Sequence, residues 1–452
     1  MTKLNAFLVS VLSAAALNAA TIEQVIVRQQ WPWSTDIKVE YKLSAVTNPV
    51  DIAVEAYNGS ERLALPEAAI TGDRYGIAED GVGTLVIDPV AAFGTAKIAL
   101  ANFKVKLTVM EDEKMGEVLY KIFDLSTGAC QDVTRADFYN GKMGDFEDDF
   151  AKIGNGYTTT LSDTLIWTGV TNDAKYAKDF LVMRKISAKV GEWQMGSPAE
   201  ERGHRNDEPR HTVKLTQDYF IGVFPITVYQ ANLNVLKVSG ATRWEYGTYA
   251  ESHGDKNLMP ATMSIGYARG SDYFWPRDEH VITTGRFLDK LRQLTGNKYE
   301  FDLPTEAQWE FACRAGTSTI MYDGKAWPNT DDTYMTANAG QYLGWSTSNS
   351  GGDTGVQGYW PVGLKRPNAF GLYDMVGNIG EFCLDTYAAD YGGTSGVSEN
   401  PKGPTIEALD GGKVIRRGCN YSLGPDGYRS AHRYTSLSGG FEGVRVAFTE
   451  AD

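Results

Sequence analysis

Beyond residue 316 the chain is a long succession of Gly-, Asn- and Asp-rich loops with short strands between them. Long loops inside a compact domain are uncommon, and they persist where buried aromatic side chains, cross-links or ions hold them. The chain has 48 Gly, 10 Trp and 24 Tyr, which indicates a turn-rich architecture with aromatic clusters. This region therefore predicts a domain with few long helices.

The 452 residues exceed one ordinary domain, so two folded units are expected. Hydrophobic residues alternate in 36–43 and in 50–56, and the second run ends at the turn Asn58-Gly59. The pattern returns in 83–88 and in 105–110. Several short strands with Pro and Gly between them favour an immunoglobulin-like β-sandwich over residues 21–115.

Residues 116–179 are assigned to a connecting segment. Its acidic stretch Asp145–Asp149 is either a solvated loop or a calcium-binding loop. The apolar run Phe180–Ile186 predicts a strand that opens a second domain over residues 180–452.

Two helices are predicted in that second domain. In 284–295 the apolar side chains recur at helical spacing, and Gly296 follows where the helix would end. Thr305 and Gln308 form a capping box at the start of a short helix that Gly316 can terminate.

Six ordered groups of residues resemble the formylglycine-generating, or sulfatase-modifying factor, enzymes. They are 195–197 with 209–215, 220–227, 303–312, 368–375, 377–382, and 416–418 with 429–433. The resemblance implies an α+β domain with a C-type-lectin-like fold that calcium often stabilises.

The cysteines depart from that family. Its oxidases use a cysteine pair and a copper ion between the Arg-Gly-Gly block and the following arginines. Residues 420–433 contain no cysteine, and the nearby Cys419 stands where the family has its second glycine. We therefore expect no copper and no standard catalytic residues. The other cysteines are Cys130, Cys313 and Cys383, and the sequence does not fix any disulfide pairing.

Histidines argue against the iron-dependent sulfoxide-forming enzymes of the same fold. Those enzymes need grouped histidine ligands, whereas the five histidines of this chain are scattered, and His204 and His211 lie seven residues apart. An iron site of that kind is not expected.

Calcium is the metal that the resemblance favours. The family's ligand positions correspond to the side chains of Asp374 and Glu381 and to the carbonyls of Gly377 and Ile379. A second site would use Asn338 and an acid near Asp353. The alternative is that Asp374 and Glu381 cap turns through hydrogen bonds.

The arginines of this domain are expected to form structural salt bridges. Arg314, Arg416, Arg429, Arg433 and Arg445 stand among aromatic residues. Glu306, Glu310 and Asp385 are the predicted partners.

The first twenty residues predict a signal peptide. Lys3 precedes an apolar run over 4–17, and small residues follow at 18–20. We therefore expect a secreted, periplasmic or cell-surface protein with no membrane span. The net charge of −14 and the pI near 5.0 oppose binding to nucleic acid.

The sequence is compatible with two functions. The first is a calcium-stabilised binding or surface module that uses residues 419–443 to contact a protein or glycan. Its aromatic contacts would be Tyr421, Tyr428, Tyr434 and Phe441, unless these side chains belong to the core. The second is a metal-dependent oxidoreductase acting on a thiol, in which Cys419 and a recruited ligand such as His432 hold the metal.

Overall fold

The computed structural model describes most of the chain, with gaps. The described residues are 7–9, 20–29, 33–47, 50–63, 65, 69–75, 77–98, 102–110, 116–139, 142–143, 145, 165–188, 191–238, 251–270, 281–324, 340–351, 355–391, 395–403, 413–436 and 441–449. They form two compact units: an N-terminal unit of residues 1–119 and 133–144, and a C-terminal unit of residues 120–132 and 145–452.

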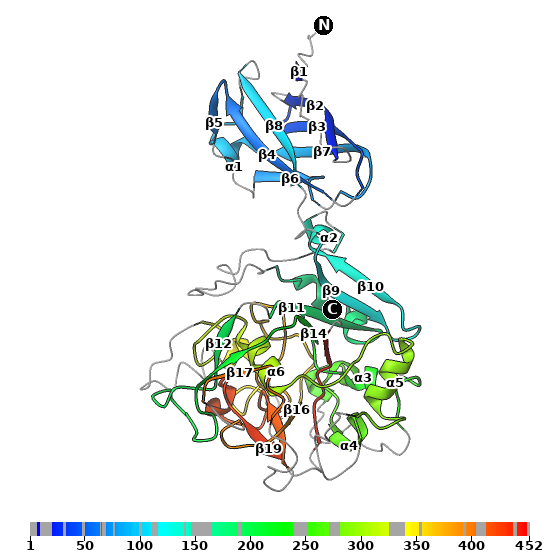
Figure 1. Cartoon of the computed structure of the whole chain (residues 1–452), viewed down its shortest axis with the longest axis vertical. Helices are drawn as coiled ribbons and strands as arrows, with labels where there is room; N and C mark the ends of the chain where they lie inside the picture. Colours follow the sequence, from blue (N-terminus) through cyan, green and yellow to red (C-terminus); the bar gives the residue numbers. More distant parts are fainter. Residues whose placement is uncertain are drawn as a thin grey trace. The chain divides into compact units, whose positions relative to one another are not determined.

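The N-terminal unit contains two antiparallel sheets, drawn in blue and cyan in Figure 1. The first has the order β1-β2-β3-β7-β6, with bounds Phe7–Val9, Thr21–Gln29, Ile37–Ser44, Gly81–Ile87 and Ile70–Gly72. The second has the order β5-β4-β8, with bounds Glu61–Leu63, Asp51–Asn58 and Phe103–Met110. The short helices α1 (Pro89–Phe93) and α2 (Arg135–Tyr139) complete the unit.

Alternation of side chains explains how these two sheets share one core. Ile37, Val39 and Tyr41 of β3 are at most 2% exposed, and Ile52 and Leu107 of the other sheet join the same apolar cluster. Successive strand residues face opposite sides of a sheet, so β3 buries every second side chain, and β7 buries every second residue from Gly83 to Ile87. The four predicted strands are confirmed, while the immunoglobulin-like topology stays a prediction.

The C-terminal unit is organised around a five-stranded antiparallel sheet. Its order is β10-β9-β11-β14-β21, with bounds Cys130–Thr134, Val118–Asp124, Phe180–Ile186, Tyr219–Gly222 and Ala447–Thr449. The predicted strand 180–186 is confirmed as β11. Residues 120–124, which lie in the predicted connecting segment, pair directly with β11.

Smaller sheets and short helices occupy the rest of this unit. The sheets are β12-β13-β17 (Glu192–Met195, His211–Lys214, Val397–Glu399), β16-β18-β19 (Glu381–Thr386, Val414–Arg417, Tyr434–Ser436) and β15-β20 (Met263–Ser264, Phe441–Glu442). The helices are α3 (Val228–Asn232), α4 (Ile265–Ala268), α5 (Phe287–Leu294), α6 (Glu306–Arg314) and α7 (Gly340–Leu343). Mixed small sheets with few helices agree with the predicted α+β class.

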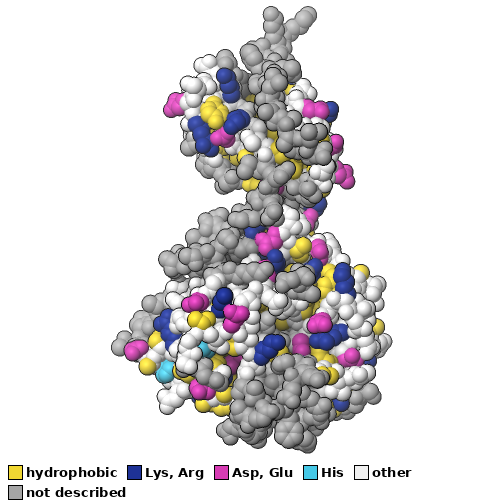
Figure 2. All heavy atoms as spheres, viewed as in Figure 1, with side chains coloured by type: hydrophobic (Ala, Val, Ile, Leu, Met, Phe, Trp, Pro, Cys, Tyr) yellow, Lys and Arg dark blue, Asp and Glu magenta, His cyan; other side chains and the backbone are white. Residues whose placement is uncertain are grey.

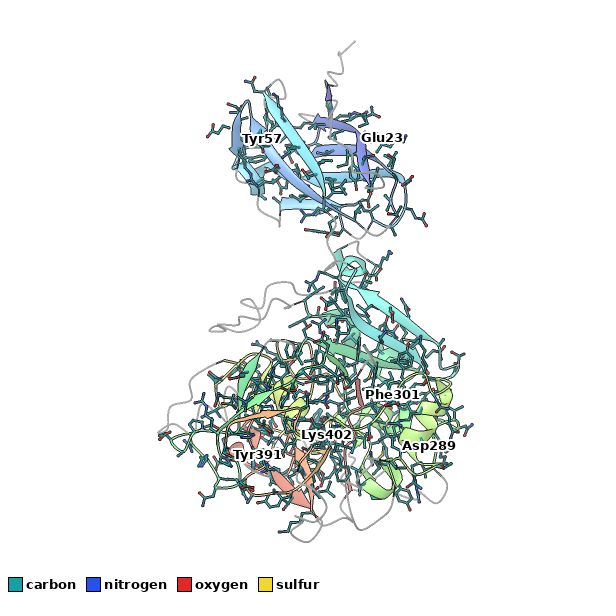
Figure 3. The ribbon with its side chains drawn as sticks, in the orientation of Figure 1. Glu23, Tyr57, Asp289, Phe301, Tyr391 and Lys402 are labelled. Atoms are coloured by element: carbon teal, nitrogen blue, oxygen red, sulfur yellow. The ribbon has the colours of Figure 1, made fainter. Side chains whose placement is uncertain are left out.

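Helix α6 shows how local sequence sets an element's bounds. Thr305 caps the helix by accepting a hydrogen bond from the Gln308 N–H, and the Gln308 side chain bonds the Thr305 N–H in return. Ala315, with φ of 44°, ends the helix in the left-handed conformation, one residue before the predicted Gly316. Every side chain of α6 except that of Gln308 is buried. Figure 3 shows side chains filling the space between the strands and helices of this unit.

Among the residues that the structure describes, no helix has the length and apolar character needed to cross a membrane.

Candidate functional site

Glu381, a predicted calcium ligand, is held by protein groups at both carboxylate oxygens. Arg445 donates to Oε1 and Oε2 over 2.7–3.0 Å, and the Trp309 indole N–H donates to Oε2 over 2.7 Å. Both side chains of the ion pair are fully buried. Strand β16 places Glu381 at this point, where it connects α6, through Trp309, with the segment before β21, through Arg445.

Asp374 is also occupied within its own loop. Its Oδ2 accepts from the Gly363 N–H at 2.8 Å and its Oδ1 from the Asn378 amide at 3.3 Å. Asn378 in turn bonds both the N–H and the carbonyl of Trp360 over 3.0 Å. Burial raises the pKa of Asp374 to about 6, although the Gly363 bond opposes that rise.

These contacts do not fit a calcium ion at residues 374–381. Calcium needs six to eight oxygen ligands, but both carboxylates already accept from nitrogen donors, and the Gly377 carbonyl accepts from the Ile379 N–H at 2.8 Å. Across the described ranges, no group of three His, Cys, Asp or Glu side chains is placed to hold a metal. The other predicted ligands, Asn338 and Asp353, lie outside the described residues, so calcium there stays a prediction.

All five predicted arginines form ion pairs, but only two of them pair with a predicted partner: Arg314 with Glu310 and Arg433 with Glu306. Arg416, Arg429 and Arg445 pair instead with Glu442, Glu208 and Glu381. Arg417, which was not predicted, pairs with Glu306 and Glu310. The prediction of Asp385 as a partner was wrong among the described ion pairs. Its Oδ2 instead accepts from the Glu306 N–H at 2.5 Å.

A small cleft of about 200 Å³ lies beside Cys419 and is lined by Gly380, Arg416, Asn420, Leu423, Tyr434 and Glu442. The thiol itself is 1% exposed, and its burial raises the pKa of Cys419 to about 12. All four cysteines of the chain are free thiols. At neutral pH Cys419 therefore carries its proton, which a metal bound at its sulfur would have to displace.

His432, the recruited ligand of the oxidoreductase hypothesis, is a neutral buried side chain. Burial, together with the charges of Arg429, Arg417 and Arg205, lowers the pKa of His432 to about 2. Its ring stacks on Tyr434 with the centroids 4.1 Å apart. Three arginines around the imidazole oppose a cation at this position, so the residues present do not fit copper.

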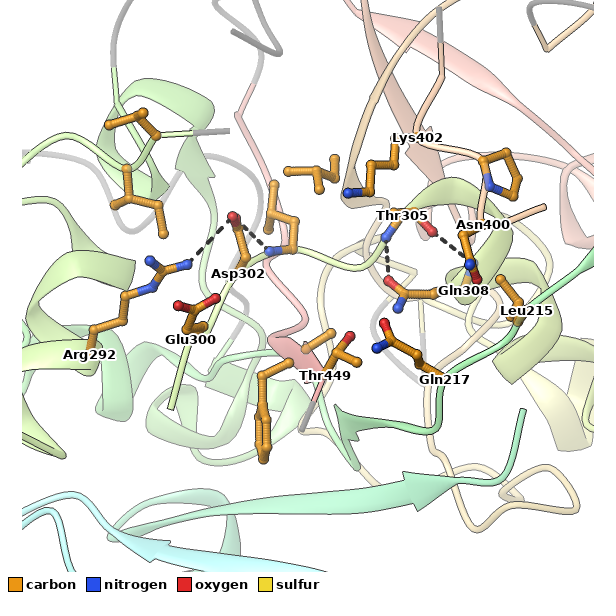
Figure 4. Close-up of a pocket in the computed structure, with 17 residues that line it drawn as sticks. Leu215, Gln217, Arg292, Glu300, Asp302, Thr305, Gln308, Asn400, Lys402 and Thr449 are labelled. Atoms are coloured by element: carbon orange, nitrogen blue, oxygen red, sulfur yellow. Dashed lines mark hydrogen bonds and ion pairs between the residues drawn. The ribbon is translucent and has the colours of Figure 1, made fainter. Parts of the chain in front are cut away.

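A larger cleft of about 670 Å³ opens elsewhere in the C-terminal unit. Figure 4 shows Arg292, Glu300 and Asp302 along one side, and Gln217, Gln308, Asn400 and Lys402 along the other. The lining comes from six separate parts of the chain, within 215–217, 281–292, 300–308, 400–402 and 447–449 and at Leu384, and none of them carries a local signal of a cleft. No sequence pattern therefore predicted this group of residues.

Residues 171–449 match the sulfatase-modifying factor enzyme 1-like domain family. The chain belongs to this family.

Curated relatives of this sulfatase-modifying factor domain match the chain over only part of their own lengths. The serine/threonine-protein kinase pkn1 of Chlamydia pneumoniae is 28% identical over 261 residues, which cover 57% of this chain and 36% of that protein. The formylglycine-generating enzyme of Mus musculus is 34% identical over 121 residues, covering 26% of this chain and 30% of that enzyme. The chain thus spans about a third of the length of these relatives.

Among solved structures, Treponema denticola variable protein 1 has a TM-score of 0.43 and 21% identity. The match covers 60% of this chain and 96% of that protein.

The aromatic residues predicted for contact in this sulfatase-modifying factor domain divide between core and surface. Tyr428 is 1% exposed and belongs to the core, as the alternative interpretation expected. Tyr421 and Tyr434 are half-buried and pack against core clusters with part of each ring accessible. Phe441 opens β20, and its side chain lies outside the described residues.

Proposed function

We propose that this chain is an exported binding or surface module built on the sulfatase-modifying factor domain and that it lacks formylglycine-generating activity. Its ligand would be a protein or a glycan. The alternative, a metal-dependent oxidoreductase acting on a thiol, has no observation in its favour.

The state of Cys419 is the observation that supports the loss of activity. The family's oxidases need a pair of thiolates, whereas Cys419 is a single thiol with a pKa near 12 and 1% exposure. A Cβ added at Gly427 would lie 2.8 Å from its sulfur and 2.8 Å from the Tyr434 hydroxyl. Cys419 therefore packs closely against Gly427, as a small core residue does.

The binding role is supported by two half-buried tyrosines, Tyr421 and Tyr434, of which Tyr434 lines the small cleft. Tyr421 and Tyr434 each have one part anchored in the core and one part accessible. Anchored aromatic rings contribute much of the energy of protein interfaces because they bury large area with few freely rotating bonds.

The test is copper reconstitution of the purified protein, followed by elemental analysis of the wild type and of Cys419→Ser. We expect less than a tenth of an equivalent of copper in both, on the order of nonspecific binding. One equivalent of copper in the wild type that is lost in Cys419→Ser would overturn the proposal. A formylglycine-generating enzyme treated in the same way is the positive control.

Export is tested separately by expressing the full chain in a bacterial host and sequencing the N-terminus of the mature protein. We expect cleavage near residue 20, because small residues end the apolar run there. A protein that stays in the cytoplasm with residues 1–20 still attached would contradict export.

A further inference from the structure

The large cleft is framed by groups that are already fixed in the protein. Arg269 holds Asp302 through two bonds of 2.7 and 2.8 Å, and Asp302 exchanges two backbone hydrogen bonds of 2.8 Å with Ala447. On the other side, the Asn400 side chain accepts from the Thr216 N–H at 2.9 Å and donates to its hydroxyl at 2.6 Å. A frame of this kind is formed before any ligand arrives, which lowers the ordering cost of binding.

Several polar side chains of the lining form no hydrogen bond or ion pair with another described residue. Gln217, Glu300 and Lys402 are exposed and Thr449 is half-buried, and none of these four side chains has a hydrogen bond or ion pair with another described residue. Glu300 lies across the cleft from Lys402 in Figure 4. The cleft therefore offers a carboxylate, an ammonium group, a carboxamide and a hydroxyl to a ligand.

This chemistry excludes two classes of ligand. An apolar ligand would bury Glu300 and Lys402 without partners, and such burial is costly. A polyanion would meet the Glu300 carboxylate in a chain of net charge −14.

A peptide also fits poorly. Peptides commonly add a strand to a sheet edge or insert apolar side chains into pockets. Here β21 is the last strand of its sheet, but Asp302 already occupies the outer backbone groups of Ala447. Three of the apolar lining residues, Leu303, Ala447 and Phe448, are only 3–4% exposed, so they offer little surface to an apolar side chain of a peptide.

We propose that this cleft binds a short saccharide through Gln217, Glu300, Lys402 and Thr449. Sugar hydroxyls donate and accept at once, so they match a carboxylate, an ammonium group and a carboxamide in one cleft. Val281, 53% exposed at the cleft, gives an apolar contact for one face of a sugar ring. The volume of about 670 Å³ lies within the usual range of ligand sites, about 300–1,000 Å³.

The first step of the test uses the purified full chain on an array of neutral, amino and acidic tri- to hexasaccharides, with an array of short peptides beside it. The trisaccharide with the strongest signal is then titrated calorimetrically. We expect saturable saccharide binding. Binding to peptides alone, or to neither array, would overturn the proposal.

The second step compares variants of exposed residues with matched controls. Lys402→Ala and Glu300→Gln each remove a charged hydrogen-bond partner, and we expect each to weaken binding about tenfold. Lys237→Ala and Glu192→Gln change exposed residues that do not line the cleft, and they should leave affinity unchanged. Equal affinity of the cleft and control variants would show that the sugar binds elsewhere.

The inference rests on the proposed binding role but concerns a different cleft from that of Cys419. Copper-dependent turnover together with saccharide binding would end the proposed loss of activity and leave this inference standing. Absence of saccharide binding together with absence of copper-dependent turnover would overturn this inference and leave the proposed loss of activity standing.

Discussion

The two units of this molecule stabilise their interiors in different ways. The described ion pairs of the N-terminal unit are on its surface, as with Lys106 and Glu55, whose side chains are 57% and 20% exposed. In the C-terminal unit, Glu381 and Arg445 are both 0% exposed. Figure 2 shows acidic and basic side chains interspersed on the visible surface. The pair of Glu381 and Arg445 lies beneath that surface.

The difference follows from the backbone. In the N-terminal unit regular strands pair with one another, so a largely apolar interior is sufficient, although Asp51 and Arg74 are buried there as well. In the C-terminal unit, buried arginines donate hydrogen bonds to backbone carbonyls of the loops and strand ends around them. Arg445 donates to the carbonyls of Gly222, Val223 and Tyr373 as well as to Glu381. A buried arginine thus replaces the ladder hydrogen bonds that loops lack.

The variant Glu381→Gln tests the contrast between buried and surface ion pairs most strongly. The change leaves the Arg445 charge buried without its partner, and we expect the C-terminal unit to lose about 3–5 kcal/mol of unfolding free energy. Hydrogen exchange measured by mass spectrometry reports each unit separately. The loss should be equal in calcium and in chelator, because Arg445 holds the carboxylate. A loss that appears only with calcium would show that Glu381 binds the metal.

The second prediction concerns the pH dependence of the C-terminal unit. Burial, with the nearby Glu306 charge, raises the pKa of Asp385 to about 8, from 3.8 in the unfolded chain. Between these values the folded state keeps a proton that the unfolded state releases, so stability falls as the pH rises. From pH 5 to pH 7 we expect a loss on the order of 2–3 kcal/mol.

Asp385→Asn is the control for that pH dependence, because its amide oxygen still accepts from Glu306 and carries no proton to lose. Denaturant titrations at each pH should show a flatter profile for the variant. Identical profiles for both proteins would show that Asp385 is ionised in the folded state.

Helix caps should give equal effects in the two units. Asp88 caps α1 in the N-terminal unit and Thr305 caps α6 in the C-terminal unit. Because capping is local, Asp88→Ala and Thr305→Ala should each cost about 1 kcal/mol. Hydrogen exchange in the unit concerned is the readout. A much larger loss at Thr305 would mean that α6 organises the loops around it.

The smallest effect is expected from the surface pair of the N-terminal unit. Lys106→Met removes one partner of Glu55, and we expect a change of about 0–1 kcal/mol in unfolding free energy. Urea titration of the full chain is sufficient to measure it. A loss comparable with that of Glu381→Gln would remove the contrast between the units.

Local features were predictable from the sequence, and long-range ones were not. The alternation through Ile37, Val39 and Tyr41 and the capping box at Thr305 depend on residues within a few positions of one another. Glu381 pairs with Arg445 across 64 residues, and no spacing rule connects them. The family resemblance suggested calcium for Glu381, but the position alone did not show that an arginine would occupy it.

The most direct test of the proposed loss of activity is aldehyde formation on a cysteine-containing peptide, with added copper and oxygen. A formylglycine-generating enzyme runs in parallel. We predict no aldehyde above the background without protein, because the buried thiol of Cys419 has no cysteine partner. Catalytic aldehyde formation that disappears in Cys419→Ser would contradict the account and identify this residue as catalytic.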